Sequence, residues 1–137
     1  MTYSSTTTLE DLSKRLHQAH SIVVLTHAKP DGDALGSTAA LVRALNATWP
    51  KELPPRAQAW YVSPMPTWAE DVLGDTPHRI LGASIGGSDG PPPHVDPDFV
   101  VICDTGSWNQ LEHVQDWIRS RSGTIAIVDH HVEGHPD

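Results

Sequence analysis

Three nearly continuous apolar segments constrain the fold of this chain more than any other feature. They occupy residues 22–26, 98–103 and 124–128 and are rich in Ile and Val. Strands that are apolar on both faces occur mainly in parallel sheets covered by helices. Weaker strand patterns lie at 57–62 and 79–81, and helices are predicted at 9–19, 34–47, 68–73 and 111–118. We therefore predict a three-layer α/β fold: a mostly parallel, Rossmann-like sheet of about five strands, including a buried strand at 124–128, with helices on both faces.

The composition limits the size and the location of the protein. With 137 residues, of which 38% are apolar, the chain supports one domain with a modest core. Residues 82–97 are rich in Gly and Pro, so we expect a surface loop there. The single Cys103 excludes an internal disulfide and is read as a packed core thiol. No membrane span or secretory signal is visible, and a cytoplasmic location is the default expectation.

The net charge of −8 excludes a generally basic nucleic-acid-binding surface. It does not exclude a phosphorylated substrate, because bound divalent cations would reverse the local field.

A polar motif follows the first predicted strand. It runs over residues 26–37 and holds His27, Asp31 and Asp33 in the spacing H-x3-D-x-D, with Gly32 between the aspartates. Gly32 is expected to give the turn backbone angles that other residues resist, so that the two aspartates point to different targets. Pro-Asp-Gly-Asp alone is an ordinary turn, and neither a Walker loop nor a G-x-G-x-x-G motif is present. Imidazole and carboxylate ligands together suit Mn or Zn better than Ca or Mg.

Two other predicted strands also end in acidic or imidazole groups. Asp104 follows 98–103, and Asp129, His130 and His131 follow 124–128. Because the carboxyl ends of parallel strands share one edge of a sheet, all three groups are expected to converge there. The sequence therefore predicts a metal site built from remote turns.

Together these three motifs resemble the DHH phosphoesterase superfamily, in the family's order and over residues 26–131. The forms Pro-Asp-Gly-Asp-Ala-Leu-Gly-Ser and Cys-Asp-Thr-Gly are most similar to the bifunctional oligoribonuclease and 3′-phosphoadenosine-5′-phosphate phosphatase group. The resemblance implies a manganese-dependent hydrolase that cleaves phosphodiester or phosphomonoester bonds by two-metal activation of water. Its substrate would be a short single-stranded oligonucleotide or a nucleotide such as 3′-phosphoadenosine 5′-phosphate.

The resemblance also implies roles for individual residues. His27 and Asp31 would hold one Mn²⁺, and Asp33 and His130 would hold a second. Asp104 would bridge the two ions and act with His131, which would face the substrate phosphate, as a catalytic residue. Asp129 would fix the ring of a neighbouring histidine. Mg²⁺ and Co²⁺ are alternatives to Mn²⁺.

In that family the N-terminal domain continues to a fourth metal-binding aspartate and is followed by a substrate-binding domain. We therefore expect residues 1–137 to be a truncated N-terminal DHH domain, and inactivity of the fragment alone is an open alternative. A RecJ-type single-strand exonuclease, a cyclic-dinucleotide phosphodiesterase and a non-catalytic nucleotide- or metal-binding module also remain open, as does a structural domain that binds nothing. A homodimer is compatible with the sequence.

Overall fold

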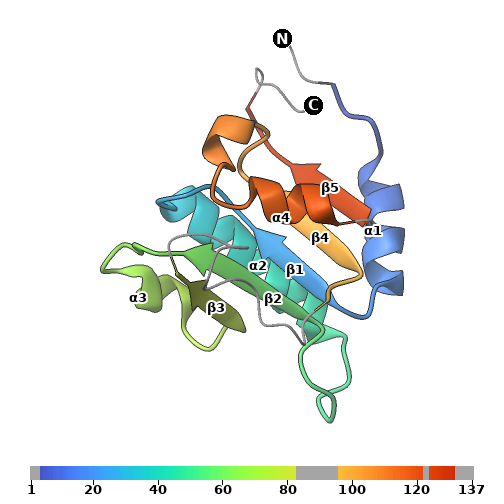
Figure 1. The fold of residues 1–137 in the computed structure, drawn as a ribbon. Coiled ribbons are helices and arrows are strands. Elements are labelled where there is room, and N and C mark those ends of the chain that lie inside the picture. The colour runs from blue at the N-terminus through green and yellow to red at the C-terminus, as the bar shows by residue number, and fades with distance from the viewer. Residues whose placement is uncertain (1–3, 83–95, 122–123, 132–137) are drawn as a thin grey trace.

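A five-stranded parallel sheet forms the centre of the computed structural model, which describes residues 4–82, 96–121 and 124–131 (Figure 1). Its strands are β1 (Ile22–Leu25), β2 (Ala57–Val62), β3 (His78–Leu81), β4 (Phe99–Cys103) and β5 (Thr124–Val128). Their order is β3-β2-β1-β4-β5, and every neighbouring pair is parallel. The predicted fold class is confirmed.

Helices cover both faces of this sheet. The helices α1 (Leu9–Gln18), α2 (Gly32–Ala47) and α3 (Ala69–Leu73) share one apolar core with the strands. The 3-10 turn η1 (Trp108–Gln110) and helix α4 (Gln115–Ser120) flank a second core on the opposite face. Figure 1 shows α4 in front of the sheet and α2 behind it. Strands β1 and β4 are buried on both faces, which explains why their sequences show no polar alternation.

Two helix boundaries differ from the prediction. Helix α2 begins at Gly32 rather than at residue 34, because the Asp31 side chain caps it by accepting a hydrogen bond from the Ala34 amide at 3.0 Å. The predicted helix at 111–118 is wrong in its first half. The chain makes turns there, and α4 begins only at Gln115, although Leu111 and Val114 are buried as the apolar spacing predicted.

The prediction that strand 124–128 is buried is also wrong. Strand β5 pairs only with β4 among the described residues and forms an edge of the sheet. Ile127 and Val128 are 42% and 41% exposed. An apolar sequence identifies a strand, but it does not say whether another element covers it.

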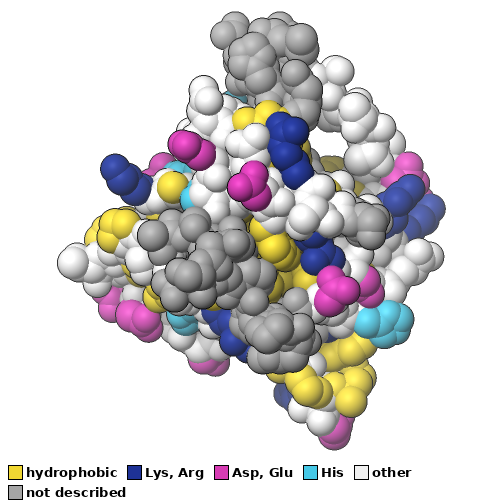
Figure 2. Space-filling view, viewed as in Figure 1, with side chains coloured by type: hydrophobic (Ala, Val, Ile, Leu, Met, Phe, Trp, Pro, Cys, Tyr) yellow, Lys and Arg dark blue, Asp and Glu magenta, His cyan; other side chains and the backbone are white. Residues whose placement is uncertain are grey.

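The predicted surface loop at 82–97 lies largely outside the described residues, which stop at residue 82 and resume at residue 96. In the part of the chain that the structure describes, no helix combines the length and the apolar character needed to cross a membrane. Figure 2 shows acidic and basic side chains interspersed on the face viewed there, with no single basic patch.

Candidate metal centre

The candidate site lies where the carboxyl ends of β1, β4 and β5 meet. After β1 the chain moves outward to β2 and β3, and it then returns to place β4 on the other side of β1. Such a reversal leaves a crevice beyond the strand ends, which is the usual ligand site of open α/β sheets. The structure brings the turns after all three strands together at this crevice.

The first half of the site contains His27, Asp31 and Asp104. The Nε2 atom of His27 lies 3.8 Å from Asp31 Oδ1 and 3.5 Å from Asp104 Oδ2. The other ring nitrogen, Nδ1, lies 2.8 Å from the Ala28 carbonyl oxygen and donates to it. In the neutral ring this bond leaves the Nε2 lone pair directed at the two carboxylates, which is the arrangement found in metal-binding histidines.

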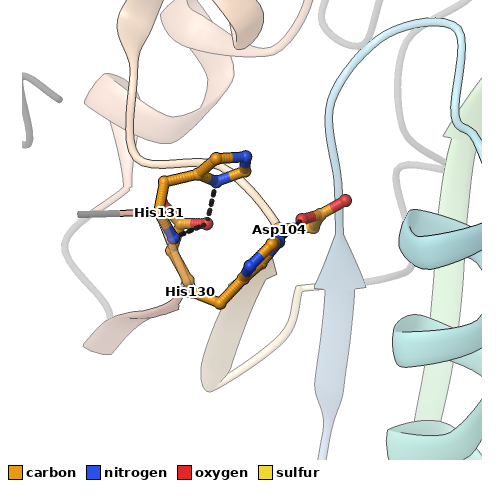
Figure 3. A group of neighbouring side chains, drawn as sticks. Asp104, His130 and His131 are labelled. Carbon is orange, nitrogen blue, oxygen red and sulfur yellow. Dashed lines mark hydrogen bonds and ion pairs between the residues drawn. The ribbon is translucent and has the colours of Figure 1, made fainter. Parts of the chain in front are cut away.

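The second half contains His130, Asp33 and the other oxygen of Asp104. The Nε2 atom of His130 lies 3.2 Å from Asp33 Oδ2. The same atom lies 3.0 Å from Asp104 Oδ1 (Figure 3). Asp104 therefore turns one carboxylate oxygen towards each histidine. Its side chain is 6% exposed, whereas those of Asp31 and Asp33 are 66% and 60% exposed.

An unusual backbone conformation aims Asp104 between the two histidines. Its φ angle is 64°, in the left-handed region that costs a non-glycine residue about 1–2 kcal/mol. The Asp104 amide donates to the Val128 carbonyl of β5 at 3.0 Å, which holds this turn in place. Such strain is typical of functional sites. The expected role of Gly32 is wrong: it lies in the first turn of α2 without a positive φ, and Lys29 (φ 52°) takes the left-handed position instead.

His131 lies beside its neighbours in the same turn. Its Nδ1 lies 2.6 Å from Asp129 Oδ1, and this hydrogen bond raises the pKa of His131 above its usual value. The rings of His130 and His131 are 4.4 Å apart between centroids (Figure 3). The second oxygen of Asp129, Oδ2, is buried without a hydrogen-bond partner among the described residues. A buried carboxylate oxygen in this state favours a cation nearby.

The α2 cap keeps Asp31 ionised. The hydrogen bond from the Ala34 amide is the largest cause of the lowered pKa of Asp31, and the nearby His27 lowers it further. The positive end of the helix dipole also favours carboxylates at this terminus, where Asp33 lies as well. Leu35, which is fully buried against the sheet, anchors the turn that carries both aspartates.

The donor set fits divalent cations. Two groups each bring ligand atoms within 4.8 Å of one another: His27, Asp31 and Asp104, and Asp104, Asp129, His130 and His131. Ligands about 2.1 Å from one ion are separated by about 3.0–3.4 Å at octahedral or tetrahedral angles. The facing atoms of the site are 3.0–3.8 Å apart. Mixed carboxylate and imidazole donors suit transition metals such as Mn, Co and Zn.

A groove of about 730 Å³ opens beside the site, bordered by Asp33, Asp104 and His130. It runs along α1 and α2 over β4 and β5, and its other lining is mostly apolar. Cys103 also lines it, but burial raises the pKa of this thiol to about 12, so it is not a nucleophile at neutral pH. No sequence pattern predicted this groove, because helices and strands that are distant in the chain form it.

Comparisons with known proteins identify the family and the fold of the chain. No curated protein is detectably similar to the chain. Among solved structures, an exopolyphosphatase-related protein from Bacteroides fragilis has the same fold, with a TM-score of 0.65 and 19% sequence identity. The match covers 92% of this chain and 35% of the other, so this chain spans about a third of that neighbour's length. Residues 21–137 match the family described as "DHH family, N-terminal domain". The chain therefore belongs to the DHH family, as an N-terminal domain of that family.

Proposed function

We propose that the protein is a metal-dependent phosphoesterase that uses two cations to hydrolyse a phosphate ester. One observation carries this proposal: the two oxygens of the buried Asp104 carboxylate face His27 and His130 at 3.5 and 3.0 Å. A carboxylate placed in this way can join two cations. Two-metal sites with such a bridge are typical of enzymes that hydrolyse phosphate esters. Membership of the DHH family supports the same reaction class.

The site residues take the following roles in this proposal. His27 and Asp31 would hold one cation, Asp33 and His130 would hold the second, and Asp104 would contribute one carboxylate oxygen to each. When bound, the pair of cations activates water and neutralises charge on the phosphoryl oxygens. Mn²⁺ is the preferred ion on the basis of the donor set.

His131 supports the reaction through its proton. The raised pKa of His131, caused by Asp129, favours the protonated ring. In the hydrolysis the oxygen of water forms a bond to phosphorus and its proton passes to solvent, while the bond from phosphorus to the ester oxygen breaks and the leaving oxygen takes up a proton. In this proposal His131 supplies this proton, or a positive charge beside the phosphoryl group.

The proposed substrate is a short oligonucleotide or a nucleotide such as 3′-phosphoadenosine 5′-phosphate. Trp68 supports a nucleotide over an inorganic chain, because its indole is 41% exposed beside the metal-site turn. The ring tip lies 4.0 Å from the position that a Cβ atom on Gly32, between Asp31 and Asp33, would take. Exposed aromatic rings are platforms on which nucleobases stack. Inorganic polyphosphate is the second candidate, because the structural neighbour is described as exopolyphosphatase-related.

The protein that carries these residues is expected to release nucleotide or phosphate in the presence of Mn²⁺. The assay compares a ribodinucleotide, 3′-phosphoadenosine 5′-phosphate and tripolyphosphate, each with Mn²⁺ and with EDTA. Faster Mn²⁺-dependent cleavage of the nucleotides supports the proposal, whereas preferential cleavage of tripolyphosphate favours the second candidate. Tight Mn²⁺ binding without cleavage of any phosphate ester would support the non-catalytic module instead.

Replacing Trp68 by Ala is expected to weaken the binding of nucleotide substrates selectively. Base stacking contributes about 1–3 kcal/mol, so KM for the dinucleotide should rise roughly 5- to 150-fold. KM for tripolyphosphate, which has no base, should not change. The variant Trp68→Phe keeps an aromatic face and serves as the control. An equal change in KM for both substrates would show that Trp68 does not contact a base.

A further inference from the structure

The η1 turn connects the two turns that carry the candidate metal ligands. The main-chain carbonyl of Gln110 accepts a hydrogen bond from the Ala28 amide at 3.4 Å. Ala28 is also the residue whose carbonyl oxygen receives the Nδ1–H of His27. The position of the His27 ring is therefore tied to η1 through a single residue.

The side chain of Gln110 reaches the other ligand turn. Its Oε1 accepts a hydrogen bond from the hydroxyl of Thr105, which is fully buried and directly follows Asp104. The Thr105 hydroxyl also accepts from the Ser107 amide at 3.4 Å. A buried hydroxyl that donates to only one described partner depends strongly on that partner.

Thr105 is therefore held at both its donor and acceptor positions, next to a residue in a strained conformation. Asp104 has a φ angle of 64° and directly precedes Thr105, so the direction of its carboxylate depends on how the Thr105 backbone is held. For two cations to share the Asp104 carboxylate, one of its oxygens must stay directed at His27 and the other at His130.

Other hydrogen bonds also stabilise these two turns. The Thr26 hydroxyl donates to the Cys103 carbonyl at 2.9 Å, and His113 forms a hydrogen bond with the Thr26 backbone. Gln110 differs from these residues because it contacts both turns, one through its main chain and the other through its side chain.

We propose that Gln110 is a positioning residue that sets the orientation of the Asp104 carboxylate between His27 and His130, and thereby the affinity of the site for a pair of divalent cations. This inference rests on the proposed two-metal function. Groups that hydrogen-bond directly to a metal ligand change metal affinity by about 10- to 100-fold when they are removed. Gln110 acts through Thr105 and Ala28, so we expect its removal to have an effect at the lower end of this range.

The test measures Mn²⁺ dissociation constants by calorimetry on the 137-residue chain. Gln110→Ala is expected to weaken Mn²⁺ binding by about 10-fold. Gln110→Glu keeps an acceptor for the Thr105 hydroxyl. Its affinity for Mn²⁺ should therefore be close to that of the wild type and no weaker than that of Gln110→Ala. Gln115→Ala removes a glutamine side chain from α4, where its amide faces Arg119, and is the matched control with wild-type affinity.

Variants of Thr105 test the same bond from its other end. Thr105→Val should reproduce the loss of affinity, and Thr105→Ser, which keeps the hydroxyl, should restore it. The double variant that combines Thr105→Val with Gln110→Ala should bind Mn²⁺ no more weakly than either single variant, because both substitutions remove the same hydrogen bond. If Gln110 and Thr105 only stabilise the fold, their variants should have a lower metal-free melting temperature, and Thr105→Ser should not restore the affinity for Mn²⁺ in this way.

Two outcomes separate this inference from the function on which it rests. A wild-type chain that binds Mn²⁺, with Gln110→Ala and Thr105→Val binding as tightly as Gln115→Ala, would overturn the positioning role alone. A wild-type chain that binds no Mn²⁺ would overturn the two-metal proposal and the inference with it.

Discussion

Replacing Asp104 by Asn is expected to reduce Mn²⁺-dependent hydrolysis by more than about 100-fold. Loss of a residue that only supports a metal ligand already costs about 10- to 100-fold, and a shared ligand affects both cations. Asn keeps the shape of the side chain but lacks the charge and the second carboxylate oxygen needed to join two cations. The rate of nucleotide release at saturating Mn²⁺ is the measurement.

Melting curves separate this effect from a loss of fold. The metal-free melting temperature of Asp104→Asn should stay near the wild-type value, because the substitution preserves volume and removes a negative charge from a crowded site. The rise in melting temperature that Mn²⁺ gives the wild type should disappear, since a ligand at ~100 times its dissociation constant adds about 2.7 kcal/mol. Asp75→Asn is the control, because Asp75 precedes β3 and lies at the opposite edge of the parallel sheet. Near-normal turnover by Asp104→Asn would refute the role of Asp104.

The second large effect concerns the helix that carries Asp31 and Asp33. Leu35→Ala is expected to lower the free energy of unfolding by about 2–5 kcal/mol, because Leu35 is fully buried in the core beneath α2 and its truncation leaves a cavity. Urea unfolding followed by circular dichroism measures this change.

A leucine outside the core provides the comparison for Leu35. Leu53 is 50% exposed, so Leu53→Ala should change the free energy of unfolding by less than about 0.5 kcal/mol. Saturating Mn²⁺ should return part of the stability that Leu35→Ala loses, because metal binding favours the folded state. Equal destabilisation by both substitutions would show that α2 does not pack as described.

The fold was predictable because the strongest patterns lie in the strands that determine it. The uninterrupted apolar character of β1 and β4 indicated central parallel strands, and the structure has both buried between neighbours. The same pattern misled for β5, which lies at an edge. Sequence character reports what a strand can bury, whereas its exposure depends on which other elements reach it.

The candidate site was predictable only as far as topology determines it. Parallel strands place the residues after their carboxyl ends together, so the approach of Asp33, Asp104 and His130 followed from the strand pattern. The left-handed conformation of Asp104 and the contacts of Gln110 had no sequence signal. Hydrogen bonds between irregular turns follow no periodic spacing, so they appear only in three dimensions.

The proposed sharing of Asp104 by two cations is tested most directly by titrating the chain with Mn²⁺ while recording electron paramagnetic resonance spectra. Two ions joined by one carboxylate should give a spin-coupled pair at two equivalents of Mn²⁺, and Asp104→Asn should lose the coupled signal. A single bound ion, or two uncoupled ions whose spectra do not change in Asp104→Asn, would contradict the shared site.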